Sequence, residues 1–386
     1  MNKTYKHFHR IVWAGVILAA CVIVFGGFVR LSNAGLSCPD WPTCYGRATW
    51  PVHDHEVAAA NASFERAVEV GKAWREQFHR HIAAILGLIV LSLCLLEAKR
   101  RARAVWIPVA CAALVAASIP TYMYWHHNPA FALAAAGILG LLVFAVRAGP
   151  VPYIRFTAVL LAVIIMQAML GMWTVTWLLK PVVVMSHLLG GLTTFSLLTW
   201  LAWRATPNAT LVHVDAGLLK RLLWLGLALL ALQIALGGWT SANYAALACG
   251  TEFPKCLGAW VPAHDFHEGF ILWRGIGVDY EGGVLDGPAR VAIQLAHRGM
   301  AVVVGLYLLA LAVKLLRTPG LMYWGSLLLL AVLAQITLGI SNVHFGLPLW
   351  VAVAHNAGAA LLLFIVVGLL ARLQHPEPDD NGGASA

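Results

Sequence analysis

Long apolar runs alternate with short polar segments along the whole chain. Each run is close to the roughly 20 residues that a helix needs to cross the hydrocarbon core of a membrane. Only 11% of the 386 residues are charged, against about 25% in soluble domains. We therefore predict an all-α polytopic membrane protein. The ten predicted spans are residues 11–30, 81–98, 104–121, 130–147, 154–177, 183–203, 221–240, 292–313, 320–342 and 349–372.

Basic residues gather in the short polar segments on one side of the predicted membrane. Such basic segments face the cytoplasm, so the placement of these residues sets the orientation of the chain in the membrane. The net charge of +9 therefore does not indicate a nucleic-acid partner. We expect a bacterial inner-membrane protein with both termini in the cytoplasm and the long loops 31–78 and 241–291 outside. The basic residues are Lys3, Lys6, Arg10, Lys99, Arg100, Arg101, Arg103, Arg147, Arg155, Arg204, Lys220, Arg221, Lys314 and Arg317.

The two halves of the chain repeat each other, which indicates a duplicated helix bundle. The segment GGFVRLSNAGLSC (26–38) aligns with GGWTSANYAALAC (237–249), and QAMLG…SHLLGG (167–191) aligns with QITLG…AHNAGA (335–359). In the latter pair the Gln and the His are 20 residues apart in both copies (187 − 167 and 355 − 335). The predicted domains are 1–205, 206–376 and a disordered tail, 377–386.

One part of the first half has no counterpart in the second. His79 and His187 are 108 residues apart, whereas His297 and His355 are 58 apart, a difference of 50. Two extra spans account for this surplus. We therefore predict an eight-span core with a helical hairpin inserted at about 101–148.

Four histidines begin spans at the outer side, two in each half: His79, His187, His297 and His355. Ionisable residues inside a membrane usually mark function, and neutral imidazoles on facing helices are good axial ligands for haem iron. We predict two bis-histidine haem sites; the alternative is a set of polar ties between helices. We expect small residues beside these histidines to let a flat macrocycle approach, namely Gly190, Gly191, Gly299 and Gly358.

Charged neighbours distinguish the two sites. Arg80 and Arg298 directly follow a histidine and are predicted to neutralise haem propionates, or else to serve as ordinary interfacial anchors. Glu76 precedes His79 by three residues and so shares its helix face, whereas Gln294 takes this place before His297. We predict Glu76 as the catalytic residue, relaying protons; the alternative is a solvated carboxylate at a helix start.

Four cysteines lie in the predicted outer loops, where bacterial disulfides persist. We predict the pairs Cys38–Cys44 and Cys249–Cys256, one per copy, with metal binding or thiols that react during turnover as alternatives. The same loops carry two His-and-acid clusters that fit metal ligands, a proton route or solvated surface. These clusters are His53, Asp54, His55 and Glu56, and His264, Asp265, His267 and Glu268.

Taken together, these motifs resemble the haem A synthase family, which converts haem O to haem A for terminal oxidases. The resemblance covers most of the chain outside 101–148 and the termini. The segments that carry it are RLSNAGLSCPDWPTCYG, GKAWREQFHRHIA, LGMWTVTWLLKPVVVMSHLLGG, YEGGVLDGPARVAIQLAHR and VAVAHNAGA.

The resemblance implies a membrane oxidoreductase that converts the C8 methyl of haem O to a formyl group by successive hydroxylations. It implies a resident haem b between His297 and His355, and the haem being modified between His79 and His187. Glu76 would match the family's essential acid, and Cys38–Cys44 its functional disulfide. Haem O would come from haem O synthase; the electron donor and any homo-oligomer are left open.

Two other functions fit the histidines. A b-type electron-transfer protein also uses bis-histidine haems, and a haem transporter or chaperone needs no chemistry. Neither requires the difference between Glu76 and Gln294, which favours the enzyme. The roles of His126 and His127 stay open.

Overall fold

A computed structural model describes residues 7–100, 104–149, 153–213 and 215–374. Ten of its helices are long and apolar enough to cross a membrane, and all ten coincide with predicted spans. They are α1 (Phe8–Leu31), α3 (Val70–Ala98), α4 (Trp106–Met123), α5 (His127–Arg147), α6 (Ile154–Thr176), α7 (Pro181–Ala205), α8 (Ala216–Ala242), α10 (Gly287–Leu316), α11 (Met322–His344) and α12 (Leu349–Arg372). The chain is thus an all-α, multi-pass membrane protein. The tail predicted at 377–386 lies outside the described residues.

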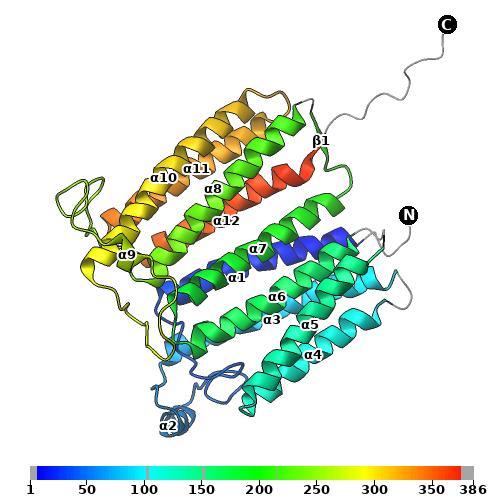
Figure 1. Ribbon diagram of the computed structural model, residues 1–386, viewed down its shortest axis with the longest axis vertical. Coiled ribbons are helices and arrows are strands. Elements are labelled where there is room, and N and C mark those ends of the chain that lie inside the picture. The colour runs from blue at the N-terminus through cyan, green and yellow to red at the C-terminus, as the bar shows by residue number, and fades with distance from the viewer. Residues whose placement is uncertain (1–6, 101–103, 150–152, 214, 375–386) are drawn as a thin grey trace.

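Each half of the sequence forms a closed ring of four antiparallel helices (Figure 1). In the first ring α1 packs on α3, α3 on α6, α6 on α7, and α7 on α1. The second ring repeats this order with α8, α10, α11 and α12. Helices α1 and α7 then pack against α12, and α7 against α8, which joins the rings. The domain boundary itself stays a prediction.

Arg30, in the last turn of α1, connects the two halves at equivalent positions of the repeat. Its guanidinium donates hydrogen bonds to the backbone oxygen of Ser241 (2.8 Å) and to the hydroxyl of Tyr244 (3.0 Å). Ser241 is the residue that aligns with Arg30 in the repeat. At the other end of the molecule, a short parallel pair of β1 (Leu211–Val212) and β2 (Leu373–Gln374) joins the segment between the halves to the end of α12.

The predicted inserted hairpin is present as α4 and α5. These helices pack mainly on each other, and α5 packs against the outside of α6 (Figure 1). The hairpin therefore adds to the edge of the first ring without entering it.

Helices α3 and α10 begin earlier than the apolar runs predicted. Their first residues are 70 and 287 rather than 81 and 292, because their opening turns pack against the outer loops. Asp286 caps α10 by accepting a hydrogen bond from the N–H of Ala289 (2.9 Å). The outer loops also contain two helices not predicted from the sequence, α2 (Asp54–Ser63) and α9 (Phe266–Gly269).

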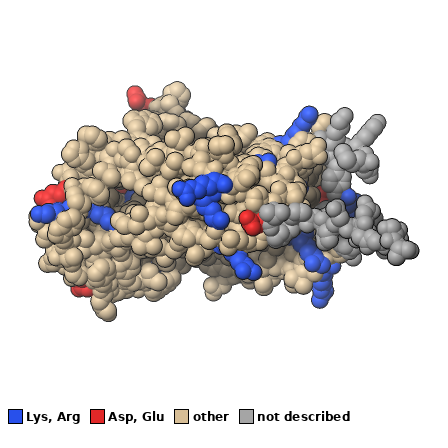
Figure 2. All heavy atoms as spheres, turned by 90° about the horizontal axis from the view of Figure 1, so that it is seen from above, with Lys and Arg blue, Asp and Glu red and all other residues tan. Residues whose placement is uncertain are grey.

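The basic side chains lie unevenly over the surface. In Figure 2 most Lys and Arg atoms lie in the middle and right of the view, and few acidic atoms are visible. Several basic residues occupy the last turn of a helix at the end opposite the cysteine loops, namely Arg147, Arg204, Lys314 and Arg372.

Candidate functional site

Two disulfide loops close one end of the rings. Cys38 bonds to Cys44 and Cys249 to Cys256, with S–S distances of 2.03 and 2.06 Å. The pairing predicted within each copy is therefore confirmed. In each loop the second cysteine forms an antiparallel backbone bridge with the residue three positions later, Cys44 with Arg47 and Cys256 with Ala259. The duplication thus extends to the backbone of these loops.

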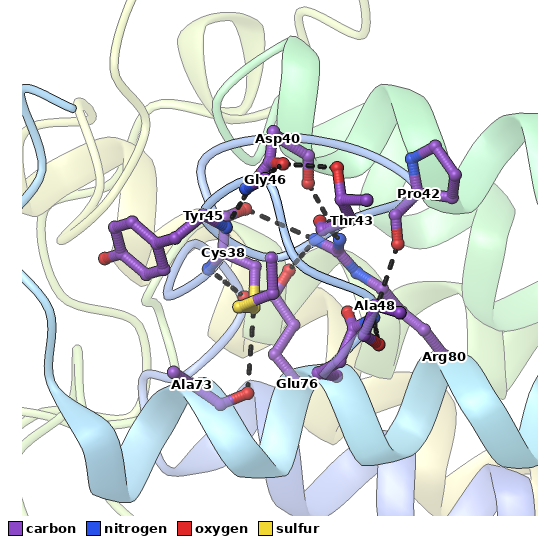
Figure 3. The surroundings of a disulfide bond; sticks show 12 residues. Cys38, Asp40, Pro42, Thr43, Tyr45, Gly46, Ala48, Ala73, Glu76 and Arg80 are labelled. Carbon is purple, nitrogen blue, oxygen red and sulfur yellow. Dashed lines mark hydrogen bonds and ion pairs between the residues drawn. A yellow bond between two sulfur atoms is a disulfide. The ribbon is translucent and has the colours of Figure 1, made fainter. Parts of the chain in front are cut away.

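Glu76 lies beneath the first disulfide loop and is only 4% exposed. Its Oε2 accepts a hydrogen bond from the backbone N–H of Cys38 (2.8 Å), and its Oε1 pairs with Arg80 (2.6 Å). Figure 3 shows both side chains rising from α3 toward the loop. The alternative of a solvated carboxylate at a helix start is therefore wrong: Glu76 is a buried acid held by the disulfide loop.

Arg80 connects the same loop to α3 through hydrogen bonds. Besides Glu76, it donates to the backbone oxygens of Asp40 (2.8 Å), Thr43 (2.7 Å) and Cys38 (3.2 Å) (Figure 3). Charge-assisted bonds of this kind are about twice as strong as neutral ones. The sequence missed this role for Arg80, because loop carbonyls leave no signal in a pattern of side chains.

In the second half an arginine also binds the disulfide loop, but no acidic residue lies beneath that loop at the position equivalent to Glu76. Arg298 donates to the backbone oxygens of Lys255 and Glu252, each at 3.1 Å. Gln294, in the place of Glu76, donates to the backbone oxygen of Ala246 (3.1 Å) and is buried. Only the first ring therefore has an ionisable group beneath its disulfide loop at this position. Contact of either arginine with a haem propionate stays a prediction.

All four predicted histidines rest on a glycine of the neighbouring helix. A Cβ added at Gly26, Gly171, Gly237 or Gly339 would lie 2.8, 3.0, 3.1 or 3.1 Å from the Cε1 atom of the ring beside it. The 2.8 Å contact is shorter than real Cβ contacts and the other three are unusually tight, so each imidazole lies directly against a helix backbone. The four pairs are Gly26 with His79, Gly171 with His187, Gly237 with His297, and Gly339 with His355.

The histidines of each ring come from diagonal helices, α3 and α7 in the first and α10 and α12 in the second. His187 lies within electrostatic range of His79, and His355 within range of His297. All four side chains are half-buried. The structure therefore brings the predicted residues together as two facing pairs, one per ring.

Three of the four histidines also contact a glutamine, which the sequence analysis missed. Gln167, Gln233 and Gln335 each stand four residues before the supporting glycine and donate to the backbone oxygen of the histidine, at 2.5, 3.2 and 3.0 Å. For Gln167 and Gln335 the signal was available in their shared separation of 20 residues from the histidine, whereas Gln233 and His297 are 64 residues apart.

The glutamines explain why glycine is needed at positions 190 and 358, which we predicted to border a macrocycle. A Cβ at Gly190 or Gly358 would collide with the Oε1 of Gln167 or Gln335. These glycines therefore make room for the glutamine side chains, and that expectation is corrected. Gly299, in contrast, has nothing within 4 Å of an added Cβ.

One acidic residue of each loop cluster acts as a helix cap. Glu56 accepts hydrogen bonds from the N–H groups of Val52 (2.9 Å) and His53 (3.2 Å), which lower the pKa of this carboxyl below its usual value. Asp265 caps α9 by accepting from the N–H of Glu268 (2.9 Å). Across the described ranges, no three or more His, Cys, Asp or Glu are grouped to hold a metal ion.

Lys180 is another residue that the sequence analysis missed. It precedes α7, is fully buried, and its Nζ lies 3.3 Å from the ring centroid of Trp273 and 5.5 Å from that of Trp177. Trp273 belongs to the long loop of the second half, so this cation–π contact joins the two halves at the end that carries the disulfide loops.

The described residues fit haem better than a bare metal ion. A protein site for a transition metal usually has three or four side-chain ligands, whereas each ring supplies only one facing pair of histidines. A porphyrin supplies four nitrogen ligands of its own and needs only the two axial positions. The ring nitrogens Nδ1 of His79 and His355 are buried without hydrogen-bond partners, which is consistent with sites completed by a further group.

Comparison with known proteins identifies the family. The family model described as "Cytochrome oxidase assembly protein" matches residues 9–120 and 117–367. The chain belongs to this family. A relative in Shewanella oneidensis named "Heme A synthase" is 38% identical over 363 residues, which cover 93% of this chain and 94% of the relative.

More distant members of the family carry the same name. Relatives named "Heme A synthase" in Caulobacter vibrioides and Paracoccus denitrificans are 25% and 24% identical. They cover 95% and 93% of this chain, and 96% and 86% of their own lengths. The family predicted from the sequence motifs is therefore confirmed.

Proposed function

We propose that this chain is a membrane oxidoreductase with haem A synthase activity. Haem O is the substrate and haem A the product, and the product serves the assembly of cytochrome oxidase. The observation that carries the proposal is the pair of facing histidines in each ring, combined with 38% identity to a haem A synthase over 93% of the chain. The electron-carrier and chaperone alternatives are not favoured, because the relatives are named as synthases.

The difference between the rings supports a division of labour. His79 and His187 hold the haem that is modified, because the buried acid Glu76 lies in their ring. His297 and His355 hold a resident haem b, whose ring has Gln294 in place of the acid. When bound, the resident haem supplies one-electron chemistry, which protein side chains cannot provide.

The protein's own residues position the substrate and move protons. Converting a methyl group to a formyl group requires two successive hydroxylations and the loss of water from the resulting geminal diol. With dioxygen as the oxidant, each hydroxylation inserts one oxygen atom into the substrate and reduces the other to water, which consumes two protons and two electrons from a donor. Glu76 holds and delivers a proton at its carboxylate oxygens, and Arg80 keeps that carboxylate at the disulfide loop through its 2.6 Å contact.

The orientation follows from the distribution of charge. The disulfide loops lie on the extracytoplasmic side of a bacterial inner membrane, and the basic helix ends, together with both chain termini, lie in the cytoplasm. An oxidising compartment at the loops agrees with two disulfides.

Expression in a bacterium that makes haem O but lacks its own haem A synthase tests the activity. Haems extracted from the membranes are separated and identified by mass. We expect haem A only in cells that carry this chain. Haem O without haem A, in cells whose membranes contain the folded chain, overturns the proposal.

A further inference from the structure

The turn between α6 and α7 has a strained backbone. Leu178 and Leu179 both adopt the left-handed conformation, with φ angles of 49° and 59°. A Cβ atom makes this conformation costly, and glycine avoids that cost. Two leucines in succession therefore need support from their surroundings to keep the turn in this shape.

The second ring contains the same turn with an easier sequence. Gly346 and Leu347, between α11 and α12, have φ angles of 66° and 63°. In both turns the two left-handed residues donate their N–H groups to the backbone oxygens three and five positions earlier. The first left-handed position is therefore a glycine in the second ring and a leucine, Leu178, in the first.

The first-ring turn receives its support from the other half of the chain. We call residues 273–281, in the long loop of the second half, the strap. The backbone N–H of Tyr280 donates to the oxygen of Leu178 (3.1 Å). The Tyr280 side chain is 1% exposed and packs in one buried cluster with Leu179. The strap thus contacts both left-handed residues.

The strap also holds the residue that follows them. The Nζ atom of Lys180 lies 3.3 Å from the ring centroid of Trp273, at the start of the strap. Glu281, at its end, forms an ion pair with Arg66 of the first half (2.9 Å). Three consecutive residues of the turn, 178–180, are therefore held by a strap that is itself attached to the first half.

The turn of the second ring is open by comparison. Phe345 is 65% exposed and Gly346 is exposed. Among the described residues, no hydrogen bond joins the first half to residues 345–348. Because glycine adopts the left-handed conformation without a steric penalty, this turn keeps its shape without a strap.

The strained turn sets the register between the two helices that hold His187. Gly171 and Gln167, which contact His187, lie on α6, whereas His187 lies on α7 directly after the turn. A change in the shape of the turn shifts α7 along α6. The imidazole then leaves its position against Gly171.

We infer that the strap positions His187 from the opposite half of the chain, by holding the α6–α7 turn in its left-handed conformation. Trp273 and Tyr280 are positioning residues for the first-ring haem, and the site in the first half is incomplete without the second half. The inference rests on the proposed function only in taking His187 as a haem ligand.

Hydrogen–deuterium exchange of the purified full chain measures the turn independently of haem. Tyr280→Ala removes the aromatic ring from Leu179 and is expected to speed exchange at residues 178–180 about tenfold, the scale of the penalty for a left-handed residue with a Cβ. Tyr280→Phe keeps the ring and should exchange like the unmodified protein. Phe345→Ala, in the equivalent turn of the second ring, should leave the exchange of that turn unchanged.

A glycine at the strained position tests the cause. Leu178→Gly copies the sequence of the second ring, and combined with Tyr280→Ala it is expected to return the exchange of the turn to the unmodified rate, after correction for intrinsic rates. Fast exchange that persists in this double variant overturns the inference. If Tyr280→Ala fails to fold, Trp273→Ala gives the same measurement at a side chain that is 61% exposed.

The absorption spectra of the bound haems report whether His187 has moved. In Tyr280→Ala the first-ring haem is expected to lose its six-coordinate spectrum, while the second-ring haem keeps it. Unchanged exchange and spectra in the folded variants overturn the inference, as does equal loss from both rings. Haem A production by the unmodified chain is measured in parallel. Its absence removes the proposed activity and leaves the exchange result for the strap standing.

Discussion

The carboxylate of Glu76 accepts a 2.8 Å hydrogen bond from the backbone N–H of Cys38, one partner of the first disulfide. The acid and the disulfide therefore form one unit, which Arg80 closes by binding both the carboxylate and the oxygen of Cys38. No such unit exists in the second ring, where Gln294 binds Ala246 instead.

Replacement of Glu76 by glutamine is expected to separate haem binding from chemistry. The amide fills nearly the same volume but cannot deliver a proton as a carboxylic acid does, so haem A output falls about 100-fold or more while both pigments stay bound. Haem extraction and absorption spectra measure the two quantities. Glu69→Gln, an exposed change on the loop side of the same helix, is the control. Normal haem A output from Glu76→Gln contradicts the role assigned to the acid.

The two arginines are expected to protect their own disulfides independently. Arg80→Ala removes three hydrogen bonds to the first loop and the ion pair with Glu76, and Arg298→Ala removes two hydrogen bonds to the second loop. With bonds to a charged donor worth about 1.5–3 kcal/mol each, loosening the first loop should speed reduction of Cys38–Cys44 by dithiothreitol about tenfold or more.

Thiol labelling followed by mass spectrometry identifies which pair has opened. Arg80→Ala should expose Cys38 and Cys44 only, and Arg298→Ala should expose Cys249 and Cys256 only. Equal reduction rates of both pairs in both variants would show that the arginines do not hold the loops.

The glycines beneath the histidines leave so little room that an added side chain is expected to shift the ring. Gly237→Ala places a methyl group 3.1 Å from the His297 ring, and overpacking of this kind costs about 1–3 kcal/mol. The ring has to move from its ligating position, so the purified variant loses most of its resident haem. Gly87→Ala on α3, where an added Cβ meets nothing within 4 Å, should keep full pigment. Full haem content in Gly237→Ala would place the ligand elsewhere.

The sidedness of the loops is open to direct measurement. A fluorescent protein that matures only in the cytoplasm, fused after residue 386, should fluoresce. Alkaline phosphatase, active only outside, should be active when inserted near residue 264 and inactive when inserted near residue 318. The reverse pattern would contradict the orientation taken from the basic residues.

Sequence patterns predicted the spans because a membrane helix must be apolar over a fixed length whatever its neighbours are. The repeats brought out the four histidines and the difference between Glu76 and Gln294. The partners of these residues were not predictable in the same way. Arg80 donates hydrogen bonds to loop carbonyls, and Lys180 is buried between Trp177 and Trp273. Both contacts join segments that are far apart in the chain, and such contacts leave no local sequence pattern.

The most direct test of the account is the haem content of purified protein after each histidine pair is removed. Haem is extracted, identified by mass and counted per polypeptide. We predict that His79→Ala with His187→Ala loses haem O and haem A but keeps haem b, and that His297→Ala with His355→Ala loses haem b. Loss of the same pigment from both double variants, or full pigment in either, would contradict one haem held between facing histidines in each half.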